Sequence, residues 1–261
     1  MPVSFGICRL SIIPVRKAGD DKSEMVTQLL FGDHYEVLDH HENGKWLRVK
    51  IHYDSYEGWI DATQYNEISP EYFRQVNNSD YKISLDLTSS ILYKKHHIHI
   101  VMGSILPIAT NELFKIEEQL AFNGDAKSLS QKRDFEYLKN VARKYLNTPY
   151  LWGGRTPFGI DCSGFVQVVF RICGYNLPRD SSQQVVFGKP VDFKDRQPGD
   201  LAFFKNEEGR TVHVGILLEN DKIIHASGKV RIDALDEQGI FNDQLGKHTH
   251  TFDTVRRILK N

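Results

Sequence analysis

The most informative stretch of the chain reads Asp161-Cys162-Ser163-Gly164-Phe165-Val166-Gln167-Val168-Val169-Phe170-Arg171-Ile172-Cys173-Gly174. Its apolar residues recur at helical spacing, which predicts a helix from Cys162 to Cys173 with one buried face. Asp161 suits the N-cap and Gly174 suits the stop. A thiol on the first turn of a helix meets the positive end of the helix dipole, which lowers its pKa. We therefore predict that Cys162 is a nucleophile, the alternative being a small buried hydrophobic residue.

A histidine is the expected base for this thiol. His213 lies in a predicted strand, Thr211-Val212-His213-Val214-Gly215-Ile216, where it shares one face with Gly215. His225 lies in the next predicted strand. A two-residue loop between the strands would place the two histidines on opposite faces, whereas an odd loop pairs His225 with Gly215. We predict the odd loop, with Cys162 as nucleophile, His213 as base and His225 as the group that orients His213.

The rest of the chain divides into blocks. Residues 1–70 carry short strand patterns between turn signals, which is typical of a small barrel. Residues 71–79 lose this pattern and are interpreted as a linker, and residues 80–123 form a second strand-rich block. Residues 128–261 begin with helical patterns and continue as strands. We therefore expect three domains, of which the last is α+β.

Composition limits the function classes. The chain has 261 residues, a net charge of −1 and three Cys. This balance leaves no overall basic surface for nucleic acid, and the odd Cys count excludes a full disulfide framework. The three histidines of His96-His97-Ile98-His99 have no carboxylate or Cys at ligand spacing, so they are interpreted as a solvated strand or turn. We expect no metal, no cofactor and a monomer.

The N-terminus bears on location. No segment approaches the length of an apolar membrane span. The first residues lack the basic start and uninterrupted apolar run of a signal peptide, since Arg9 breaks that run. If the chain is complete at its N-terminus, we expect a cytoplasmic protein.

The motifs of the last block, taken together and in order, resemble the NlpC-type cell-wall cysteine peptidases. The residues that carry the resemblance are Tyr150-Leu151-Trp152-Gly153-Gly154, Asp161-Cys162-Ser163-Gly164-Phe165-Val166, Leu177-Pro178-Arg179-Asp180-Ser181, Pro198-Gly199-Asp200-Leu201, His213-Val214-Gly215-Ile216 and Ile224-His225-Ala226. The resemblance covers about residues 128–261 and implies a papain-like fold with a Cys–His–His triad. The bond it implies is γ-D-glutamyl to a diamino acid in peptidoglycan peptides, with lysine and diaminopimelate both open.

The two N-terminal blocks resemble bacterial SH3-like domains through Gly44-Lys45-Trp46-Leu47-Arg48-Val49 and Tyr56-Glu57-Gly58-Trp59-Ile60. The second block departs from the pattern because it has no Trp. Two such barrels before an NlpC-type domain resemble the endopeptidases of murein-peptide recycling. That resemblance implies release of L-Ala-γ-D-Glu from peptides with a free N-terminal L-Ala.

The resemblance also implies substrate contacts. In the first block Tyr56 is expected to help hold the free amine, with Glu24 as the candidate acidic residue. In the catalytic block the implied substrate-binding residues are Asp161, Ser163, Tyr150, Trp152 and Ser181. From the residues alone, Asp161 is equally well explained as a pure N-cap, and Arg179 is interpreted as a structural residue of its loop.

Two other functions stay open from the sequence. One is an amidase or acyltransferase that uses the same thiolate on the same fold and needs no amine on its substrate. The other is a binding module whose SH3-like domains grip peptidoglycan. The presence of Cys162, His213 and His225 together favours an enzyme.

Overall fold

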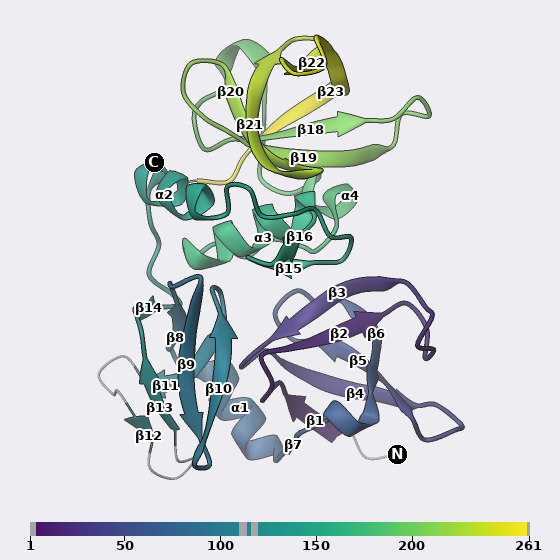
Figure 1. The fold of residues 1–261 in the computed structure, drawn as a ribbon, viewed down its shortest axis with the longest axis vertical. Helices are drawn as coiled ribbons and strands as arrows, with labels where there is room; N and C mark the ends of the chain where they lie inside the picture. Colours follow the sequence, from purple (N-terminus) through teal and green to yellow (C-terminus); the bar gives the residue numbers. More distant parts are fainter. Residues whose placement is uncertain (1–3, 110–113, 116–119, 260–261) are drawn as a thin grey trace. The chain divides into compact units, whose positions relative to one another are not determined.

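The computed structural model describes residues 4–109, 114–115 and 120–259. The chain forms two compact units (Figure 1). The first contains Met1–Gln131 together with Arg155–Pro157, and the second contains Lys132–Gly154 and Phe158–Asn261. Few helices and many strands make up both units, which confirms the α+β class.

A seven-stranded antiparallel sheet opens the first unit, in the order β3-β2-β6-β5-β4-β1-β7. Its elements are β1 (Ser4–Ile7), β2 (Ile12–Arg16), β3 (Met25–Leu30), β4 (His34–His40), β5 (Trp46–Ile51), β6 (Glu57–Asp61), the 3₁₀ turn η1 (Ala62–Gln64) and β7 (Glu67–Ile68). Alternate residues along the strands point inward, so Ile13 and Val15 of β2 meet Val49 of β5 in one apolar core.

The expected linker at residues 71–79 is wrong, because this segment is the helix α1 (Pro70–Asn78). Ser69 caps the helix through a hydrogen bond from the Tyr72 N–H, and Pro70 occupies the first turn, where its missing N–H costs nothing. Phe73 and Val76 lie three residues apart and form its buried face. Two apolar residues in a short polar segment give too weak a period to read as a helix.

Two small sheets follow in the first unit, ordered β10-β9-β13-β12 and β11-β8-β14. Their strands are β8 (Tyr81–Ser84), β9 (Thr88–Tyr93), β10 (His96–Val101), β11 (Ile105–Ala109), β12 (Phe114–Lys115), β13 (Leu120–Asn123) and β14 (Ala126–Ser128). Phe31 of the first block packs with Ile91, Ile100 and Leu106 of the second, so the two blocks share a core. Parts of the predicted second domain, residues 110–113 and 116–119, lie outside the described residues. Its assignment as an SH3-like barrel stays a prediction.

The short strand β15 (Arg155–Thr156) also belongs to the first unit. Arg155 is fully buried there, and its guanidinium donates to the Gln28 carbonyl oxygen at 2.7 Å and to Asp33 at 3.2 Å. A buried guanidinium is stable only with such acceptors, because an unpaired charge in the interior is costly.

The second unit places its helices on one side of a seven-stranded sheet ordered β17-β23-β18-β19-β20-β21-β22 (Figure 1). The helices are α2 (Phe135–Lys144), α3 (Cys162–Ile172), α4 (Ser181–Gln184) and the 3₁₀ turn η2 (Phe193–Asp195). The strands are β16 (Gly159–Ile160), β17 (Lys189–Val191), β18 (Leu201–Lys205), β19 (Thr211–Leu217), β20 (Lys222–Ser227), β21 (Lys229–Asp236), β22 (Gly239–Asn242) and β23 (Lys247–Arg257). Every residue of α3 is buried, and the helix packs against β19 and β20.

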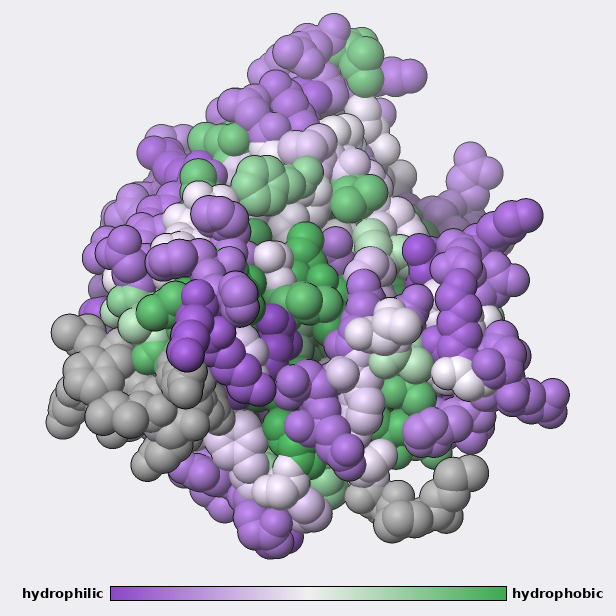
Figure 2. Space-filling model, turned by 60° about the horizontal axis from the view of Figure 1, so that its bottom comes forward, coloured by the Kyte–Doolittle hydropathy of each residue, from purple (hydrophilic) through white to green (hydrophobic). Residues whose placement is uncertain are grey.

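Hydrophilic side chains cover most of the face seen in Figure 2, with small apolar areas between them. Scattered apolar groups of this kind are normal on a surface in contact with water. In the described part of the chain, no helix has the length and apolar character needed to cross a membrane.

Candidate active site

Cys162 is the first residue of α3, where the sequence predicts it. Asp161 caps the helix by accepting a hydrogen bond from the Gly164 N–H at 2.7 Å. The thiol lies beside the backbone N–H groups of Ser163 and Val214. Because Val214 directly follows His213 on β19, this contact brings the predicted nucleophile to the strand that carries the predicted base.

The Asp161 carboxylate accepts hydrogen bonds from several neighbours. Arg179 donates to both of its oxygens, at 3.1 Å and 2.5 Å, and the Gly153 N–H donates at 2.8 Å. Gly153 has a φ of +75°, a left-handed conformation that favours glycine. Arg179 also donates to the Ser163 hydroxyl at 2.8 Å. Arg179 therefore orders the residues on both sides of Cys162, beyond the structural role in its loop that the sequence predicts.

This arrangement bears on the predicted substrate contact of Asp161. The carboxylate is 5% exposed and its charge is balanced by Arg179, which is 1% exposed. The prediction that Asp161 caps the helix is thus confirmed. A contact between Asp161 and a substrate amine stays a prediction, and it requires the amine to join a carboxylate that already carries a bidentate arginine.

The rings of His213 and His225 lie together, as the predicted odd-length loop between their strands requires. Gly215 pairs with His225 and Ile216 with Ile224, and the Leu218 N–H closes the turn on the Lys222 carbonyl. His213 Nε2 lies 2.8 Å from His225 Nδ1. The predicted register is therefore confirmed, and the turn achieves it with Asn220 and Asp221 both at positive φ.

Asp233 and Arg231 also belong to this group of side chains and were not predicted from the sequence. His225 Nε2 lies 2.9 Å from Asp233 Oδ2, and Arg231 donates to Asp233 Oδ1 at 2.8 Å. Both residues belong to β21, whose residue Arg231 pairs directly with His225. The signal was present in Val230-Arg231-Ile232-Asp233, where charged residues alternate with apolar ones and so share a face of a strand.

His250 of β23 was also missed. Its ring stacks on the His213 ring with centroids 4.1 Å apart and planes at 29°. Burial lowers the pKa of His250 to about 4, with nearby His225 adding to the effect. The neutral imidazole ring of His250 therefore covers one face of His213, the predicted base. No sequence signal points to it, because it lies 37 residues beyond His213 on a strand of mixed polar residues.

The protonation states differ from the expectation for the thiol. Burial raises the pKa of Cys162 to about 12, and the Asp161 carboxylate adds to this rise. The lowered pKa predicted from the helix start is therefore wrong in direction. A helix dipole is worth about 0.3–1 kcal/mol, less than the roughly 1.4 kcal/mol of one pKa unit, so burial outweighs it.

His213 is neutral as well. Burial, with His225 and His250 nearby, lowers the pKa of His213 well below its usual value. The resting pair is thus a neutral thiol and a neutral imidazole. A neutral thiol and a neutral imidazole can react by transferring the thiol proton to the ring as the sulfur attacks, and the resulting imidazolium can later donate a proton to a leaving group.

The remaining predicted residues fall in both units. Burial raises the pKa of the Tyr150 hydroxyl, and the nearby Cys162 and Asp161 side chains add to the rise. Ser181 is the first residue of α4, and Trp152 is 60% exposed. Tyr56 packs against the core of the first unit, and Glu24 lies 3.4 Å from Lys17 on the surface of that unit. Substrate contacts by these residues stay predictions.

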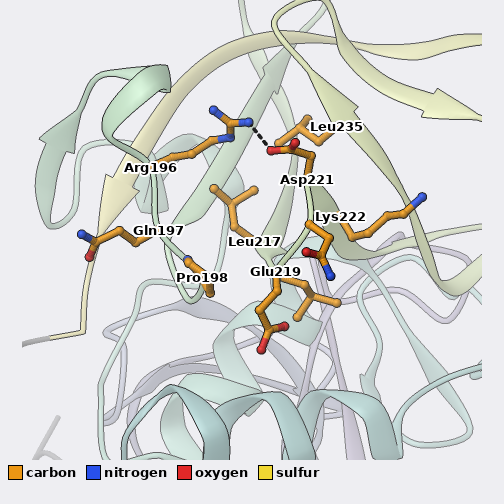
Figure 3. Close-up of a pocket in the computed structure, with 10 residues that line it drawn as sticks. Arg196, Gln197, Pro198, Leu217, Glu219, Asp221, Lys222 and Leu235 are labelled. Carbon is orange, nitrogen blue, oxygen red and sulfur yellow. Dashed lines mark hydrogen bonds and ion pairs between the residues drawn. The ribbon is translucent and has the colours of Figure 1, made fainter.

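A cavity of about 200 Å³ lies at the turn between β19 and β20 (Figure 3). An ion pair between Arg196 and Asp221 crosses it. Leu217 lines this cavity and lies four residues from His213, about 13 Å along a strand, so it is separate from the catalytic groups. Within residues 4–109, 114–115 and 120–259, no three His, Cys, Asp or Glu side chains gather in a metal-binding cluster.

Two segments of this chain, one in each unit, match known protein families. Residues 147–249 match the NlpC/P60 family, and residues 15–64 match the bacterial dipeptidyl-peptidase Sh3 domain. The chain is 31% identical over 219 residues to a gamma-D-glutamyl-L-lysine dipeptidyl-peptidase of Bacillus subtilis, covering 77% of this chain and 71% of the relative. It is 28% identical to dipeptidyl-peptidase 6 of Lysinibacillus sphaericus, covering 84% and 87%.

A solved structure supports the same fold. The NlpC/P60 family protein of Bacillus cereus superposes with a TM-score of 0.82 at 21% identity, over 97% of this chain and 99% of that one. Together with the thiol and the linked imidazoles, these matches show that the chain belongs to the NlpC/P60 family and is a cysteine peptidase that carries an N-terminal SH3-like domain.

Proposed function

We propose that this peptidase hydrolyses the bond between γ-D-glutamate and a diamino acid in murein peptides that carry a free N-terminal L-Ala. The products are L-Ala-γ-D-Glu and the remaining peptide, and the role is recycling of wall fragments. The similarity to the gamma-D-glutamyl-L-lysine dipeptidyl-peptidase carries the proposal, since it extends over 77% of this chain. A match limited to the catalytic unit would not favour this substrate over other amides.

The reaction begins at Cys162. As the sulfur attacks the γ-carbonyl carbon of the substrate, His213 takes the thiol proton. The backbone N–H groups at the start of α3 have no partner within the helix, so the Cys162 N–H is suited to stabilise the oxyanion. The carbon–nitrogen bond then breaks, and His213 gives its proton to the leaving amine. The result is a thioester of L-Ala-γ-D-Glu on Cys162.

Hydrolysis of this thioester completes the cycle. His213, neutral again, takes a proton from water while the water oxygen attacks the thioester carbon. The carbon–sulfur bond breaks and His213 returns its proton to the sulfur, which restores the Cys162 thiol. The dipeptide leaves with a new carboxyl group that releases its remaining proton to water. The lowered pKa of His213 means that the ring is unprotonated at neutral pH, so a lone pair is present to take the proton.

Recognition of a free amine would require acceptors for an ammonium group. The family resemblance assigns this to Tyr56 and Glu24 of the first unit and to Asp161. Because Arg179 already balances the charge of Asp161, we propose that Asp161 contributes an oxygen acceptor more than an unpaired charge. On this account, Glu24→Gln or Tyr56→Phe lowers kcat/KM for peptides with a free amine and leaves their acetylated counterparts unchanged.

The test is a matched pair of peptides. L-Ala-γ-D-Glu-L-Lys and its diaminopimelate analogue, each with a free or an acetylated N-terminus, are incubated with the enzyme, and released dipeptide is measured by mass spectrometry. Cleavage of only the free forms supports the proposal, while equal cleavage of both contradicts amine recognition and favours a general amidase. No cleavage, with tight binding to intact wall, would instead favour a binding module.

Two controls sharpen this assay. Cys162→Ala must be inactive on every peptide, which ties the product to the thiol. Comparison of the lysine and diaminopimelate peptides then identifies the preferred diamino acid. The cytoplasmic location expected from the sequence stays a prediction, and fractionation of cells that express the full chain checks it.

A further inference from the structure

Three neighbouring strands carry a continuous chain of contacts that ends at the predicted base. His213 Nε2 on β19 lies 2.8 Å from His225 Nδ1 on β20. His225 Nε2 lies 2.9 Å from Asp233 Oδ2 on β21. Arg231, two residues before Asp233 on the same face of β21, approaches the same Oδ2 with Nε at 2.7 Å. His225 and Asp233 are 1% and 4% exposed, so water does not compete for these contacts.

Protons can occupy this chain in a limited number of ways. Burial raises the pKa of Asp233, but hydrogen bonds from His225 and Arg231 outweigh burial, so the pKa lies below its usual value. An ionised carboxylate only accepts hydrogen bonds. The contact at Asp233 therefore requires the proton of His225 to be on Nε2.

The next contact follows from the first. Burial lowers the pKa of His225, so its ring is neutral and carries a single proton. With that proton on Nε2, Nδ1 of His225 is an acceptor. The contact with His213 then requires the proton of His213 to be on Nε2 as well. Nδ1 of His213 is left with a lone pair, which is what a base for Cys162 needs.

We propose that Asp233 is a positioning residue that selects the tautomers of both histidines and so keeps Nδ1 of His213 unprotonated. Arg231 holds the carboxylate in place from the other side. The reversed arrangement, with protons on His225 Nδ1 and His213 Nδ1, would leave His213 unable to accept the thiol proton. Asp233 acts over two hydrogen bonds and touches neither the thiol nor the substrate. This role of Asp233 does not depend on which amide bond the enzyme cuts.

Nitrogen NMR on the full-length protein tests this directly, because a protonated ring nitrogen and one with a lone pair have well separated shifts. Histidine is isotopically labelled, and the His213 and His225 signals are assigned by loss in His213→Gln and His225→Gln. We expect both rings to carry their proton on Nε2 at neutral pH. A wild-type protein with His213 protonated on Nδ1 would overturn the proposal, whatever any variant does.

Variants then connect the tautomer to the rate. Asp233→Ala removes the acceptor, so both tautomers become populated and kcat/KM falls on the order of 10- to 100-fold, the usual effect of removing such an outer partner. Asp233→Asn keeps one carbonyl oxygen. Oδ2 lies 2.9 Å from His225 Nε2 and Oδ1 accepts from Arg231, whose side chain is 19% exposed and can turn its donor to water, so we expect the asparagine oxygen to stay on His225. We expect Asp233→Asn to restore the single tautomer and most of the activity.

The matched control is Asp236→Ala, which removes another carboxylate from β21. Asp236 contacts the half-buried His248 at 2.8 Å and lies outside the chain of contacts that leads to His213. We expect this variant to leave kcat/KM and the His213 signals unchanged. If Asp233→Ala folds and keeps the wild-type tautomers, the proposal fails. If Asp233→Ala does not fold, Asp233→Asn decides, because a mixture of tautomers in that variant also contradicts the proposal.

Discussion

The two halves of the catalytic machinery are built in different ways. The thiol side, Gly153–Gly164 with Arg179, surrounds Cys162 with a turn, a helix cap and one buried ion pair. The imidazole side, His213, His225, Arg231, Asp233 and His250, draws its residues from four strands of one sheet. The hydrogen bonds of Asp161 on the thiol side join residues up to 18 positions apart, within one helix start and two loops. On the imidazole side each contact joins a different pair of strands or two residues of one strand, and His250 lies 37 positions from the ring it covers.

This difference indicates what each half contributes. Both sides contain an Asp–Arg pair, but Arg179 is 1% exposed while Arg231 is 19% exposed. The buried Arg179–Asp161 pair on the thiol side also binds the backbone at Gly153, so it stabilises the fold around Cys162. The Arg231–Asp233 pair on the imidazole side contacts a ring nitrogen of His225, so it influences where the histidines carry their protons. Stability and proton placement should therefore respond separately to substitution.

The largest expected effect is at the thiol itself. Cys162→Ala removes the nucleophile, so we expect kcat/KM to fall by at least about 10⁴-fold, as when a nucleophile is removed from a hydrolase triad. The buried side chain changes little in volume, so thermal unfolding should stay close to that of the wild type. Substantial hydrolysis by this variant, with product verified by mass spectrometry, would end the assignment of Cys162.

Next in size is the buried ion pair. Arg179→Met leaves Asp161 uncompensated, and breaking a buried pair costs about 3–5 kcal/mol in the free energy of unfolding. Arg231→Met, at a more exposed pair, should cost clearly less stability. Urea unfolding of both variants measures the difference. Equal losses would contradict the view that the thiol side holds the structure.

A smaller effect is expected at Gly215, which pairs with His225. A Cβ added there would lie 2.7 Å from the Ile223 side chain and 2.9 Å from His225 Cβ. Gly215→Ala should therefore separate the two histidines, reduce kcat/KM and cost about 1–3 kcal/mol from overpacking.

The control for Gly215→Ala is Gly209→Ala. Gly209 has a φ of +74° with no atom within 4 Å of an added Cβ, so this change strains the backbone without touching the histidines. It should reduce stability and leave kcat/KM unchanged. A similar loss of activity in both variants would mean that lowered stability, and not the histidine contact, explains the effect of Gly215→Ala.

The smallest effect is a dependence of stability on pH that belongs to the imidazole side. Burial lowers the pKa of His250 to about 4, whereas an unfolded histidine titrates near about 6.5. Between these values the unfolded chain binds more protons than the folded one, so stability falls as the pH is lowered through this window. The slope is about 1 kcal/mol per pH unit for each such group.

His250→Phe should remove its own share of this slope while keeping a ring against His213. Urea unfolding at several pH values between about 4 and 7 measures the slope for wild type and variant. An unchanged slope would show that His250 does not titrate as its burial requires.

Much of the thiol side was predictable from the sequence. Asp161 as cap, Cys162 on the first turn and the helix itself follow from residues that are adjacent in the chain, and the structure places them as expected. The odd loop between His213 and His225 was also predictable, because the period of a strand allows only two registers and one of them separates the histidines. The matches to the NlpC/P60 family and to the bacterial SH3 domain confirm the motifs that carried the resemblance.

Other features depended on the fold. The segment at residues 71–79 lies in the helix α1, which is stabilised by the packing of Phe73 and Val76. The apolar pattern of the segment is too short to predict this helix. The raised pKa of Cys162 follows from burial, which a local argument about the helix dipole does not include. A short-range pattern says which residues are neighbours in the chain, and it says little about how much water remains around them.

The amino-acid sequence was therefore enough to predict Cys162 as nucleophile and His213 and His225 as its partners, because these predictions depend on residue type and local spacing. The resemblance of its motifs to the NlpC/P60 family is confirmed. The folded chain was needed to show that Arg179 pairs with Asp161, that Asp233 contacts His225 and that the His250 ring stacks on His213. These contacts arise where separate strands and loops meet. Burial at these points, which excludes water, also explains why the pKa of the Cys162 thiol is raised and the pKa of His213 is lowered.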